Sequence, residues 1–400
     1  MHVARKFLTR VPRIAIALSS AYKTYRDMMQ GIFRYVNEHG SWAIQIVEGR
    51  DDELPLAQFK RENYDGFIGK VSTPGVLKDI LDSTLSAIIA DTSLPGFRQR
   101  IRRRPFTSQI CSDDRPIGSA AARYFLERRF SKFAYVGEIH SATWSETRCL
   151  AFRKTLESAN FRCAVYPAPS AALLRNATRE QNVLGKWLCE LPRPCAVFVS
   201  NDVRARQVLN ASLNAGLAVP KDIAVLSCDN DELICETTVP PLSSIQLDAH
   251  QTGYRAAALL DRMMRNHVPP AESERILHYG FLDIVTRNTS EAMNLSDPLV
   301  TRILAYLRLN VEMHFTMDDL AKALNVSRRL LEMRFKRATG RTLHMELMRM
   351  RMERARTLLR SGTQSVETIA GICGFSTASH FGATFSKMFG CSPRAFRKRP

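Results

Sequence analysis

Several features that mark other classes of protein are absent from this sequence. No apolar run approaches the ~20 residues that a helix needs to cross a bilayer. Met1–Arg13 is basic, and the run Ile14–Leu18 is too short for the apolar core of a secretory signal, so we expect a cytoplasmic protein with no membrane partner. The GxSxG, GxGxxG, Walker and HExxH patterns are also missing, which disfavours an enzyme, and we assign no catalytic residue.

Cysteine pairs at metal-binding spacing are missing as well. The nine cysteines include no CxxC pair, and their number is odd. Most lie in apolar runs, such as Ala224–Cys228, so we interpret them as reduced, buried thiols. The nine histidines are scattered along the chain. We therefore expect neither a metal nor another cofactor.

Acidic residues are scarce at the C-terminal end of the chain. Residues 301–400 contain 19 Lys and Arg but only 7 Asp and Glu, a net charge of +12, whereas the whole chain carries +18. A compact basic region on a nearly balanced body is typical of a polyanion binder. Charge alone leaves open the alternative of a solvated basic surface.

The first 290 residues alternate apolar, β-rich runs with amphipathic helical stretches. This alternation predicts an α/β fold with parallel sheets covered on both faces, in which ligands bind at the carboxyl ends of the strands. The predicted strands are Ile14–Leu18, Ala43–Val47, Gly66–Ile68, Ser86–Ala90, Ser108–Ser112, Phe133–Val136, Ala196–Ser200 and Ile223–Ser227. The predicted helices include Tyr25–His39, Ile117–Arg129, Glu146–Asn160, Arg179–Cys189 and Val203–Ala215.

Polar and aromatic side chains follow several of the predicted strands. Planar groups that pair with hydroxyls, and aromatic rings that stack on C–H-rich faces, suit a sugar. Each position taken alone fits a helix cap or a turn equally well. The candidate ligand-binding residues are Tyr22, Tyr25, Arg26, Asp113, Trp144, Arg148, Asn201, Asp202 and Asp229.

Three of these elements resemble the sugar-sensing domains of LacI-type regulators, which are related to periplasmic binding proteins. The elements are Asn201–Ala205, Val225–Asn230 and Arg148–Phe152. The resemblance covers about residues 12–288 and implies a two-lobed domain in which Arg148, Asn201 and Asp229 line the cleft between the lobes. The resemblance to known regulators also extends over Asp202–Arg206, and it adds Arg204 to the candidate ligand-binding residues.

Two segments of the last 100 residues repeat each other, because Phe335–Gly340 and Phe385–Gly390 share a Phe-x4-Gly pattern 50 residues apart. Each copy predicts a helix-turn-helix unit. The first copy predicts helices over Asp318–Leu324 and Arg328–Arg337, with Asn325 in the turn and Ser327 as the cap. In these roles the second copy has Gly374 and Ser376. Leu331, Phe335, Phe381 and Phe385 are expected to face inward.

A single helix over Leu343–Ser361 is predicted between the two copies. Its 19 residues span ~28 Å, which suits the reading of two major-groove faces about one turn, ~34 Å, apart. The side chains expected to contact DNA are Arg328, Arg329, Glu332, Met333, Lys336, Thr377, Ser379, His380 and Lys387.

This region resembles the AraC/XylS family over Leu320–Lys336, Arg351–Leu359 and Ile369–Arg397. Joined to a LacI-type sensor, it has the organisation of the xylose-operon regulators and their relatives. The resemblance implies a sensor over 12–288 and an all-α DNA-binding domain over 299–400. The segment 289–298 between them is polar and ends in Pro298, which is typical of a linker. The implied partners are double-stranded operator DNA, a small-molecule effector such as a monosaccharide, a second copy of the chain and, for an activator, RNA polymerase.

Three alternatives remain open at this point. An enzyme and a transport-type binding protein both share the cleft chemistry, although the missing motifs disfavour the first and the basic C-terminal region disfavours the second. A non-sugar effector such as a nucleobase is the third. Residues 24–26 read Thr-Tyr-Arg where the xylose-operon regulators have Tyr-Asp-Arg, so an acidic pocket residue is missing and xylose itself is not assured.

Overall fold

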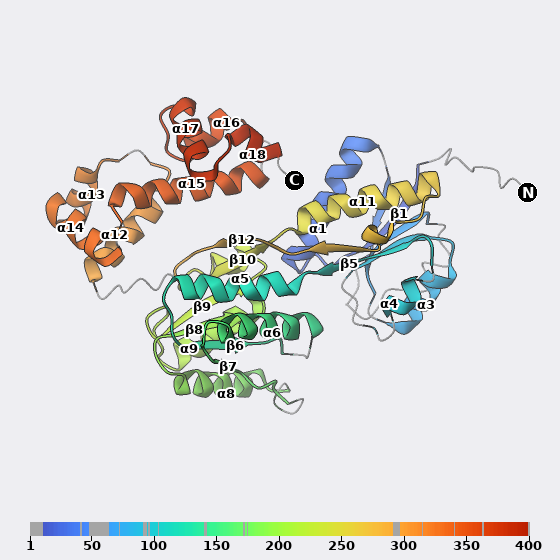
Figure 1. Ribbon diagram of the computed structural model, residues 1–400, viewed down its shortest axis with the longest axis horizontal. Coiled ribbons are helices and arrows are strands. Elements are labelled where there is room, and N and C mark those ends of the chain that lie inside the picture. The colour runs from blue at the N-terminus through green and yellow to red at the C-terminus, as the bar shows by residue number, and fades with distance from the viewer. Residues whose placement is uncertain are drawn as a thin grey trace, which may run out of the picture. The chain divides into compact units, whose positions relative to one another are not determined.

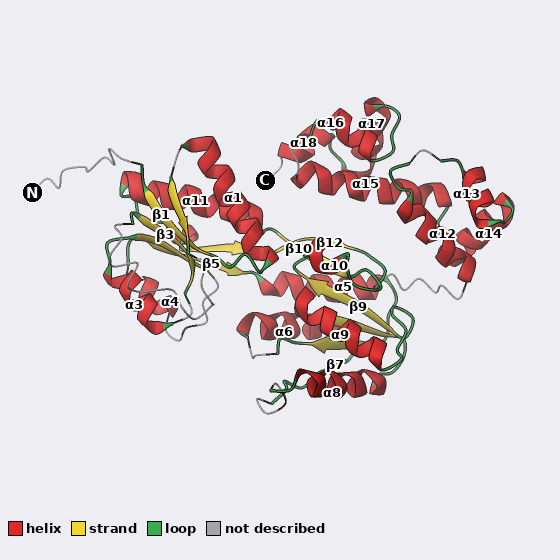
Figure 2. Cartoon of the chain, turned by 180° about the vertical axis from the view of Figure 1, so that it is seen from behind, coloured by secondary structure: helices red, strands yellow, loops and turns green. Residues whose placement is uncertain are grey.

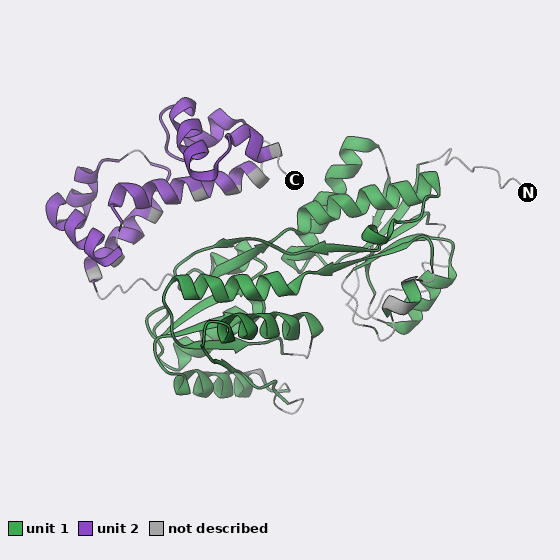
Figure 3. Cartoon of the chain, viewed as in Figure 1, with its two compact units in different colours: residues 1–291 green, residues 292–400 purple. Residues whose placement is uncertain are grey.

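The computed structural model describes residues 11–40, 42–47, 64–71, 73–90, 94, 97–102, 104–139, 142–170, 173, 175–290, 297–313, 315–339, 341–361 and 364–398. The chain divides into two compact units, Met1–Glu291 and Ala292–Pro400 (Figure 3). Of the linker predicted over 289–298, residues 291–296 lie outside the described residues. Thr289 and Ser290 are fully buried in the first unit, and Asp297 caps the first helix of the second, so both ends of this segment belong to the units themselves.

Two sheets, each with six strands in the described residues, form the two lobes of the first unit (Figure 1). The first has the order β11-β5-β4-β3-β1-β2, and all its strand pairs are parallel. Its strands are β1 (Arg13–Ala17), β2 (Ala43–Ile46), β3 (Gly66–Lys70), β4 (Ser86–Ala90), β5 (Thr107–Ser112) and β11 (Ile276–Tyr279). These assignments confirm the strands predicted in this half of the sensor and add β11.

The second sheet has the order β12-β10-β9-β8-β6-β7 and is parallel except for the edge strand β12, which runs antiparallel to β10. Its strands are β6 (Phe133–Val136), β7 (Cys163–Val165), β8 (Cys195–Val199), β9 (Ile223–Cys228), β10 (Ser243–Leu247) and β12 (Phe281–Val285). The predicted two-lobed α/β fold is thus confirmed. The antiparallel edge was not predicted, because the short runs that form β7, β10 and β12 lack a distinctive pattern.

Helices cover both sheets (Figure 2). In the first lobe they are α1 (Lys23–His39), α3 (Pro74–Asp82), α4 (Phe97–Arg102) and α11 (Ala249–Asn266). In the second lobe they are α5 (Asp114–Glu127), α6 (Thr143–Glu157), α8 (Ala177–Glu190), α9 (Asp202–Asn214) and the short α10 (Glu232–Cys235). The strand β8, buried at all five residues, shows why the central strands read as continuous apolar runs.

The helices α1 and α11 cross at two glycines. A Cβ atom on Gly31 would lie 1.9 Å from the carbonyl oxygen of His250, and one on Gly253 would lie 2.1 Å from that of Met28. Backbone therefore packs directly on backbone at this crossing, and any larger residue would have to separate the helices.

The chain passes between the lobes at three places: from β5 to α5, from β10 to α11 and from β11 to β12. Hydrogen bonds tie these passages together. The N–H of Asp113 donates to the carbonyl of Tyr279 at 2.7 Å, and the N–H of Asp248 donates to that of Gly280 at 3.0 Å. Such a bundle of passages is typical of a hinge between two lobes.

The regular secondary structure described in the second unit is all helical. Its helices are α12 (Pro298–Leu309), α13 (Met317–Leu324), α14 (Arg328–Thr339), α15 (Leu343–Ser361), α16 (Val366–Ile372), α17 (Ala378–Phe389) and α18 (Pro393–Lys398). The four predicted inward residues, Leu331, Phe335, Phe381 and Phe385, are all buried. They lie in two separate apolar cores, one against each part of α15, and Met348 packs against both.

The turns of both repeats follow the prediction in all but one residue. Asn325 has a φ of 54° and Gly374 a φ of 74°, so both take the left-handed conformation that ends the first helix of each copy. The hydroxyl of Ser327 accepts from the N–H of Leu330 at 3.3 Å, as expected of a cap. In the second copy the cap is Thr377 rather than Ser376, because the Thr377 hydroxyl accepts from the N–H of His380 at 3.2 Å.

Candidate ligand cleft and nucleic-acid interface

Arg148 lies buried on α6, and groups from two other elements fix its orientation. Its Nε donates to Oδ1 of Asp114 at 2.9 Å, at the start of α5, and its Nη1 donates to the carbonyl of Ser200 at 2.6 Å, at the end of β8. The guanidinium carbon is 4.7 Å from the centre of the half-buried Trp144 ring. An arginine held in this way presents its remaining N–H groups in a fixed direction.

Asp229 follows β9 in a strained conformation. Its φ is 110°, a backbone conformation that L-residues rarely adopt. Its N–H donates to the carbonyl of Ile245 at 2.9 Å. Burial, together with the carboxylates of Asp202 and Asp231, raises the pKa of Asp229 to about 8 against the opposing charge of Arg148. Strain and a displaced pKa at a strand end are both typical of functional positions.

Asn201 serves as a helix cap and also belongs to a polar cluster. Its Oδ1 accepts from the N–H of Arg204 at 2.8 Å at the start of α9, while its Nδ2 donates to Oε2 of Glu138 at 2.5 Å. Glu138 comes two residues after β6 and is not among the residues predicted from the sequence. Its place directly beyond a predicted strand was the signal that could have found it.

Two of the predicted ligand-binding residues have structural partners instead. The carboxylate of Asp202 is 1 % exposed and accepts from Oγ of Ser244 and from the N–H of Asp231, both at 2.6 Å, and from the hydroxyl of Ser227. It joins β9, β10 and the start of α10, and burial raises its pKa to about 6 although these hydrogen bonds act against the shift. The prediction for Asp202 is therefore corrected to a structural role.

Arg204 requires the same correction. Its side chain is 1 % exposed, and its Nη2 lies 2.7 Å from Oε1 of Glu180 on α8. Its Nη1 donates to Gln207 at 2.6 Å, and the guanidinium lies 5.7 Å from the centre of the Tyr166 ring. These contacts turn its guanidinium toward Glu180 on α8 and the Tyr166 ring, and they give it a structural role.

The candidates of the first lobe differ in their surroundings. Tyr25 is buried, whereas Tyr22 is 46 % exposed, and their rings meet edge to face at 5.9 Å. Arg26 donates to the carbonyl of Ser20 at 2.9 Å and forms an ion pair of 2.8 Å with Asp231, which belongs to the second lobe. Asp113 is exposed and precedes α5 without capping it.

Among the predicted residues, the structure thus brings Trp144, Arg148, Asn201 and Asp229 to the carboxyl ends of β6, β8 and β9. Arg26 belongs to the first lobe and is linked to the second lobe by its ion pair with Asp231. In the described part of the chain no group of three or more His, Cys, Asp or Glu side chains is arranged to hold a metal ion. No described helix is long and apolar enough to cross a membrane.

The second unit presents its predicted DNA-contacting residues on two helices. Arg328, Arg329, Glu332, Met333 and Lys336 are all exposed on α14. On the second repeat, Thr377 precedes α17 while Ser379, His380 and Lys387 lie on it, and all four are exposed. The inward sides of both helices are formed by the buried phenylalanines and Leu331, so the exposed residues named here lie outside the two apolar cores.

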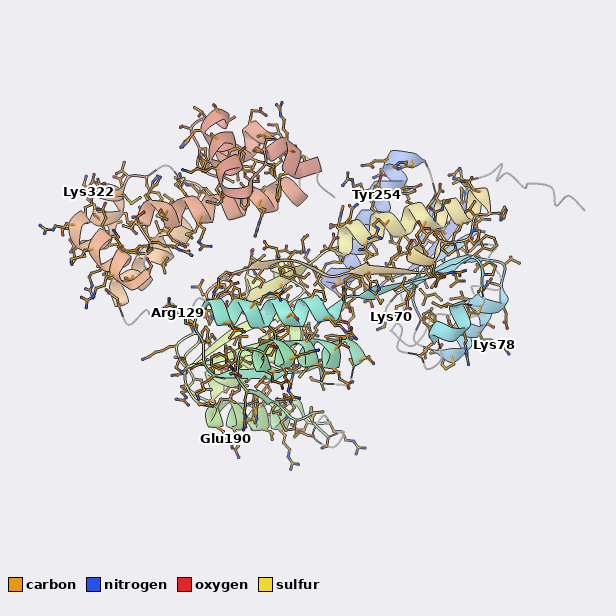
Figure 4. All side chains as sticks on the ribbon, viewed as in Figure 1. Lys70, Lys78, Arg129, Glu190, Tyr254 and Lys322 are labelled. Carbon is orange, nitrogen blue, oxygen red and sulfur yellow. The ribbon has the colours of Figure 1, made fainter. Side chains whose placement is uncertain are left out.

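Arg328 is already paired within the first repeat. Its Nε lies 2.9 Å from Glu332, and its Nη1 lies 3.3 Å from Asp318 on α13. A hollow of about 750 Å³ opens beside it at the turn between α13 and α14, where Lys322 projects into solvent (Figure 4). An exposed hollow edged by Lys322, Ser327 and Arg328 has the donors that a phosphate group requires.

Comparisons with known proteins agree with this division of the chain. Residues 122–290 match the family of periplasmic binding protein-like domains, and residues 320–399 match a helix-turn-helix domain family. The xylose operon regulatory protein of Escherichia coli K12 is 29% identical over 376 residues, which cover 90% of this chain and 95% of that protein. The corresponding protein of Haemophilus influenzae is 27% identical over 95% of this chain and 97% of its own length.

A solved structure described as the xylose-binding transcription activator xylR covers 97% of this chain and 98% of its own, with a TM-score of 0.60 and 26% identity. The fold and these relatives therefore define a transcription regulator with a ligand-sensing domain. Within that class, the chain is a homologue of the xylose operon regulatory proteins, with a periplasmic-binding-protein-like sensor joined to an AraC-type helix-turn-helix domain.

Proposed function

We propose that this chain binds operator DNA through α14 and α17 and responds to a sugar of about pentose size bound between the lobes of its sensor. The observation that carries the ligand proposal is the convergence of Arg148, Asp229 and Asn201 at one edge of the second sheet. Hydroxyl groups can donate to the Asp229 carboxylate and accept from Arg148, while the Trp144 ring offers a face for C–H groups. Apolar molecules satisfy none of these polar groups.

The names of the relatives indicate which class of sugar to test first. Xylose operon regulators and a xylose-binding activator cover nearly the whole chain, so a pentose is the first ligand to test. The Thr24-Tyr25-Arg26 segment argues for a change in specificity, because the buried Tyr25 stands where the relatives' segment carries an acidic residue. We therefore propose a pentose or a close analogue and leave xylose as one member of the test set.

The remaining parts of the proposal concern partners. We infer that the chain acts in the cytoplasm as a homodimeric activator that recruits RNA polymerase to sugar-catabolic genes. The support is its homology with a protein described as a transcription activator and with regulators named for an operon. Two recognition helices per chain double to four in a dimer, which matches a long operator of repeated half-sites.

A thermal-shift screen of the whole protein tests the ligand proposal. Pentoses, hexoses and nucleobases are added one at a time, because a ligand that binds only the folded state raises its melting temperature. We expect a shift with at least one pentose or pentose analogue and none with the nucleobases. A shift with nucleobases alone would reject sugar sensing, and turnover of a sugar would reassign the chain to the enzymes. Selection of bound fragments from a random DNA library tests the DNA proposal separately.

A further inference from the structure

One buried arginine of the second unit contacts both helix-turn-helix repeats. Arg351 lies near the middle of α15 and is 6 % exposed. Its Nε donates to the carbonyl of Val311 at 3.1 Å, and its Nη2 donates to the carbonyl of Met313 at 2.8 Å. Both carbonyls belong to the segment that joins α12 to α13. Because α12 shares one apolar core with α13 and α14, we count it with the first repeat, and Arg351 thus fastens this repeat to the central helix.

The same guanidinium also lies against the second repeat. Its Cζ is 6.0 Å from the centre of the Phe375 ring, which belongs to the turn between α16 and α17. A Cβ atom on Gly374 would lie only 2.8 Å from Cζ and from Nη2 of Arg351. Gly374 is thus required both for its φ of 74° and for the room it leaves to the guanidinium.

A second arginine, one turn further along α15, supports this junction. Arg354 forms an ion pair with Glu312, which lies between the two residues that Arg351 contacts. Burial raises the pKa of Cys373, at the end of α16, to about 11, and the charges of Arg354 and Glu312 also act on it. The segment between α12 and α13 therefore lies close to the end of α16, and the two repeats meet at this point.

The two apolar cores do not by themselves fix how the repeats are oriented relative to each other. The contacts of Arg351 and Arg354 described above, here called the polar junction, can do so. The first core contains Leu320 and Phe335, the second contains Ile369 and Phe385, and they share the partly buried Met348. A helix such as α15 fixes the distance between two packing sites, whereas the angle of each repeat about that helix depends on lateral contacts. A planar guanidinium with several fixed donors supplies such contacts to both repeats at once.

We propose that Arg351 is a positioning residue that sets the relative orientation of α14 and α17, and thereby the half-site spacing that the protein accepts on DNA. This inference rests on the proposed function, because it assumes that both helices enter the major groove of one DNA. The partner is a duplex with two half-sites about one helical turn apart. A rigid junction makes a change in that spacing costly, since one inserted base pair rotates one half-site by roughly 35° relative to the other.

The test uses the full chain and an operator selected from a random DNA library. Affinities of the wild type and of Arg351→Met are measured for the selected operator, for the same operator with one base pair inserted between its half-sites, and for a duplex with one half-site scrambled. We expect the insertion to weaken the wild type by about tenfold or more and Arg351→Met by about threefold or less. Binding to the single half-site is expected to change less than twofold.

The matched control is Arg302→Met. Arg302 also donates to a backbone carbonyl, that of Leu324 at 3.0 Å, but both residues belong to the first repeat. This variant is expected to keep the spacing preference of the wild type. If Arg351→Met does not fold, Arg351→Lys and Phe375→Leu are measured instead, because each weakens one side of the junction and keeps the rest.

The outcomes separate the inference from the function on which it rests. If no DNA is selected by the wild type, the proposed function fails before Arg351 is examined. If DNA is selected and the folded variants keep the wild-type spacing preference, the inference is rejected. It is equally rejected if affinity falls by the same factor on all three duplexes, since that pattern reports a general loss of fold and not a change in orientation.

Discussion

Nη2 of Arg26 lies 2.8 Å from Oδ2 of Asp231, and this ion pair joins the two lobes of the sensor. Arg26 comes from the first turn of α1, and Asp231 caps α10. Lys23 adds a second link of the same kind, 3.6 Å from Glu232. Two cations at the start of α1 thus face two carboxylates at the start of α10, across the edge where Arg148 and Asp229 lie.

Removal of this link is expected to favour the open sensor. In Arg26→Met the Asp231 carboxylate, only 9 % exposed, loses its partner, and the closed state loses about 1 kcal/mol. If the ligand binds the closed state, its affinity then falls by roughly fivefold. Small-angle scattering without ligand should show a larger radius of gyration, and calorimetric titration with the sugar found in the screen should show the weaker binding.

The control for this prediction is Arg34→Met, which removes an ion pair of 2.9 Å with Glu38 inside α1. Both residues are exposed and lie in one lobe, so neither the radius nor the affinity is expected to change. An Arg26→Met protein with the wild-type radius and affinity would show that the ion pair does not bias closure.

Asp229 should make ligand binding depend on pH. Its pKa is raised to about 8 without ligand, mainly by burial, so the carboxyl is largely protonated at pH 7. A sugar hydroxyl that donates to Asp229 needs the ionised form, and binding below pH 8 must therefore release a proton. Affinity is expected to rise from pH 6 to pH 8, by up to about tenfold per unit, and to level off above. Calorimetry across this range measures the slope.

Two variants decide whether this dependence belongs to Asp229. Asp229→Ala should remove the pH dependence and the ligand response while the DNA binding of the ligand-free protein remains. Asp202→Asn changes a neighbouring carboxylate that is fully enclosed by its own lobe, so it should lower the melting temperature, at a cost of about 1–3 kcal/mol. Its ligand affinity should equal that of the wild type above pH 8, where Asp229 is ionised in both proteins. Wild-type ligand affinity in a folded Asp229→Ala protein would remove Asp229 from the site.

Patterned segments could be predicted from the sequence, whereas side-chain partners could not. The helix over Leu343–Ser361 and the turn residues Asn325 and Gly374 follow from local rules of periodicity and conformation, and the structure has them as predicted. The sequence predicts Asp202 as a ligand-binding residue because it follows a strand, and Arg204 because of the resemblance over Asp202–Arg206. Their actual partners, such as Ser244 and Glu180, lie on segments 42 and 24 residues away, and only the folded chain brings them together.

Gly31→Ala is expected to destabilise the sensor strongly. The new Cβ would lie 1.9 Å from the carbonyl oxygen of His250, so α1 and α11 must move apart, at a cost of about 1–3 kcal/mol. Gly371→Ala in α16 is the matched change without steric conflict, because among the described residues no atom lies within 4 Å of its Cβ position, apart from its chain neighbours and the nearby backbone of its own helix. That variant should gain up to about 1 kcal/mol from helix propensity. Denaturant unfolding of both proteins provides the comparison, and equal effects would contradict the close helix contact.

Two neighbouring arginines at the start of α14, Arg328 and Arg329, are expected to contact DNA in different ways. Arg328 is held by Glu332 and Asp318, whereas Arg329 is exposed beside it at the start of α14, where side chains of a recognition helix enter the major groove. We expect Arg329 to contact a base. Arg329→Ala should therefore weaken operator binding about tenfold and relax the base preference at one operator position. Arg328→Ala should instead weaken all sequences alike and lower the slope of log affinity against log salt by about one phosphate contact.

Fluorescence anisotropy with the selected operator and its single-base variants, at several salt concentrations, distinguishes the two roles. Arg153→Ala, an exposed arginine on α6 of the sensor, removes one positive charge without touching the recognition helices and should leave both readouts unchanged. The proposed docking depends on the position of α14, so operator affinity must fall when both arginines are replaced together. Wild-type affinity and salt dependence in the folded Arg328→Ala, Arg329→Ala double variant would mean that α14 does not face the DNA.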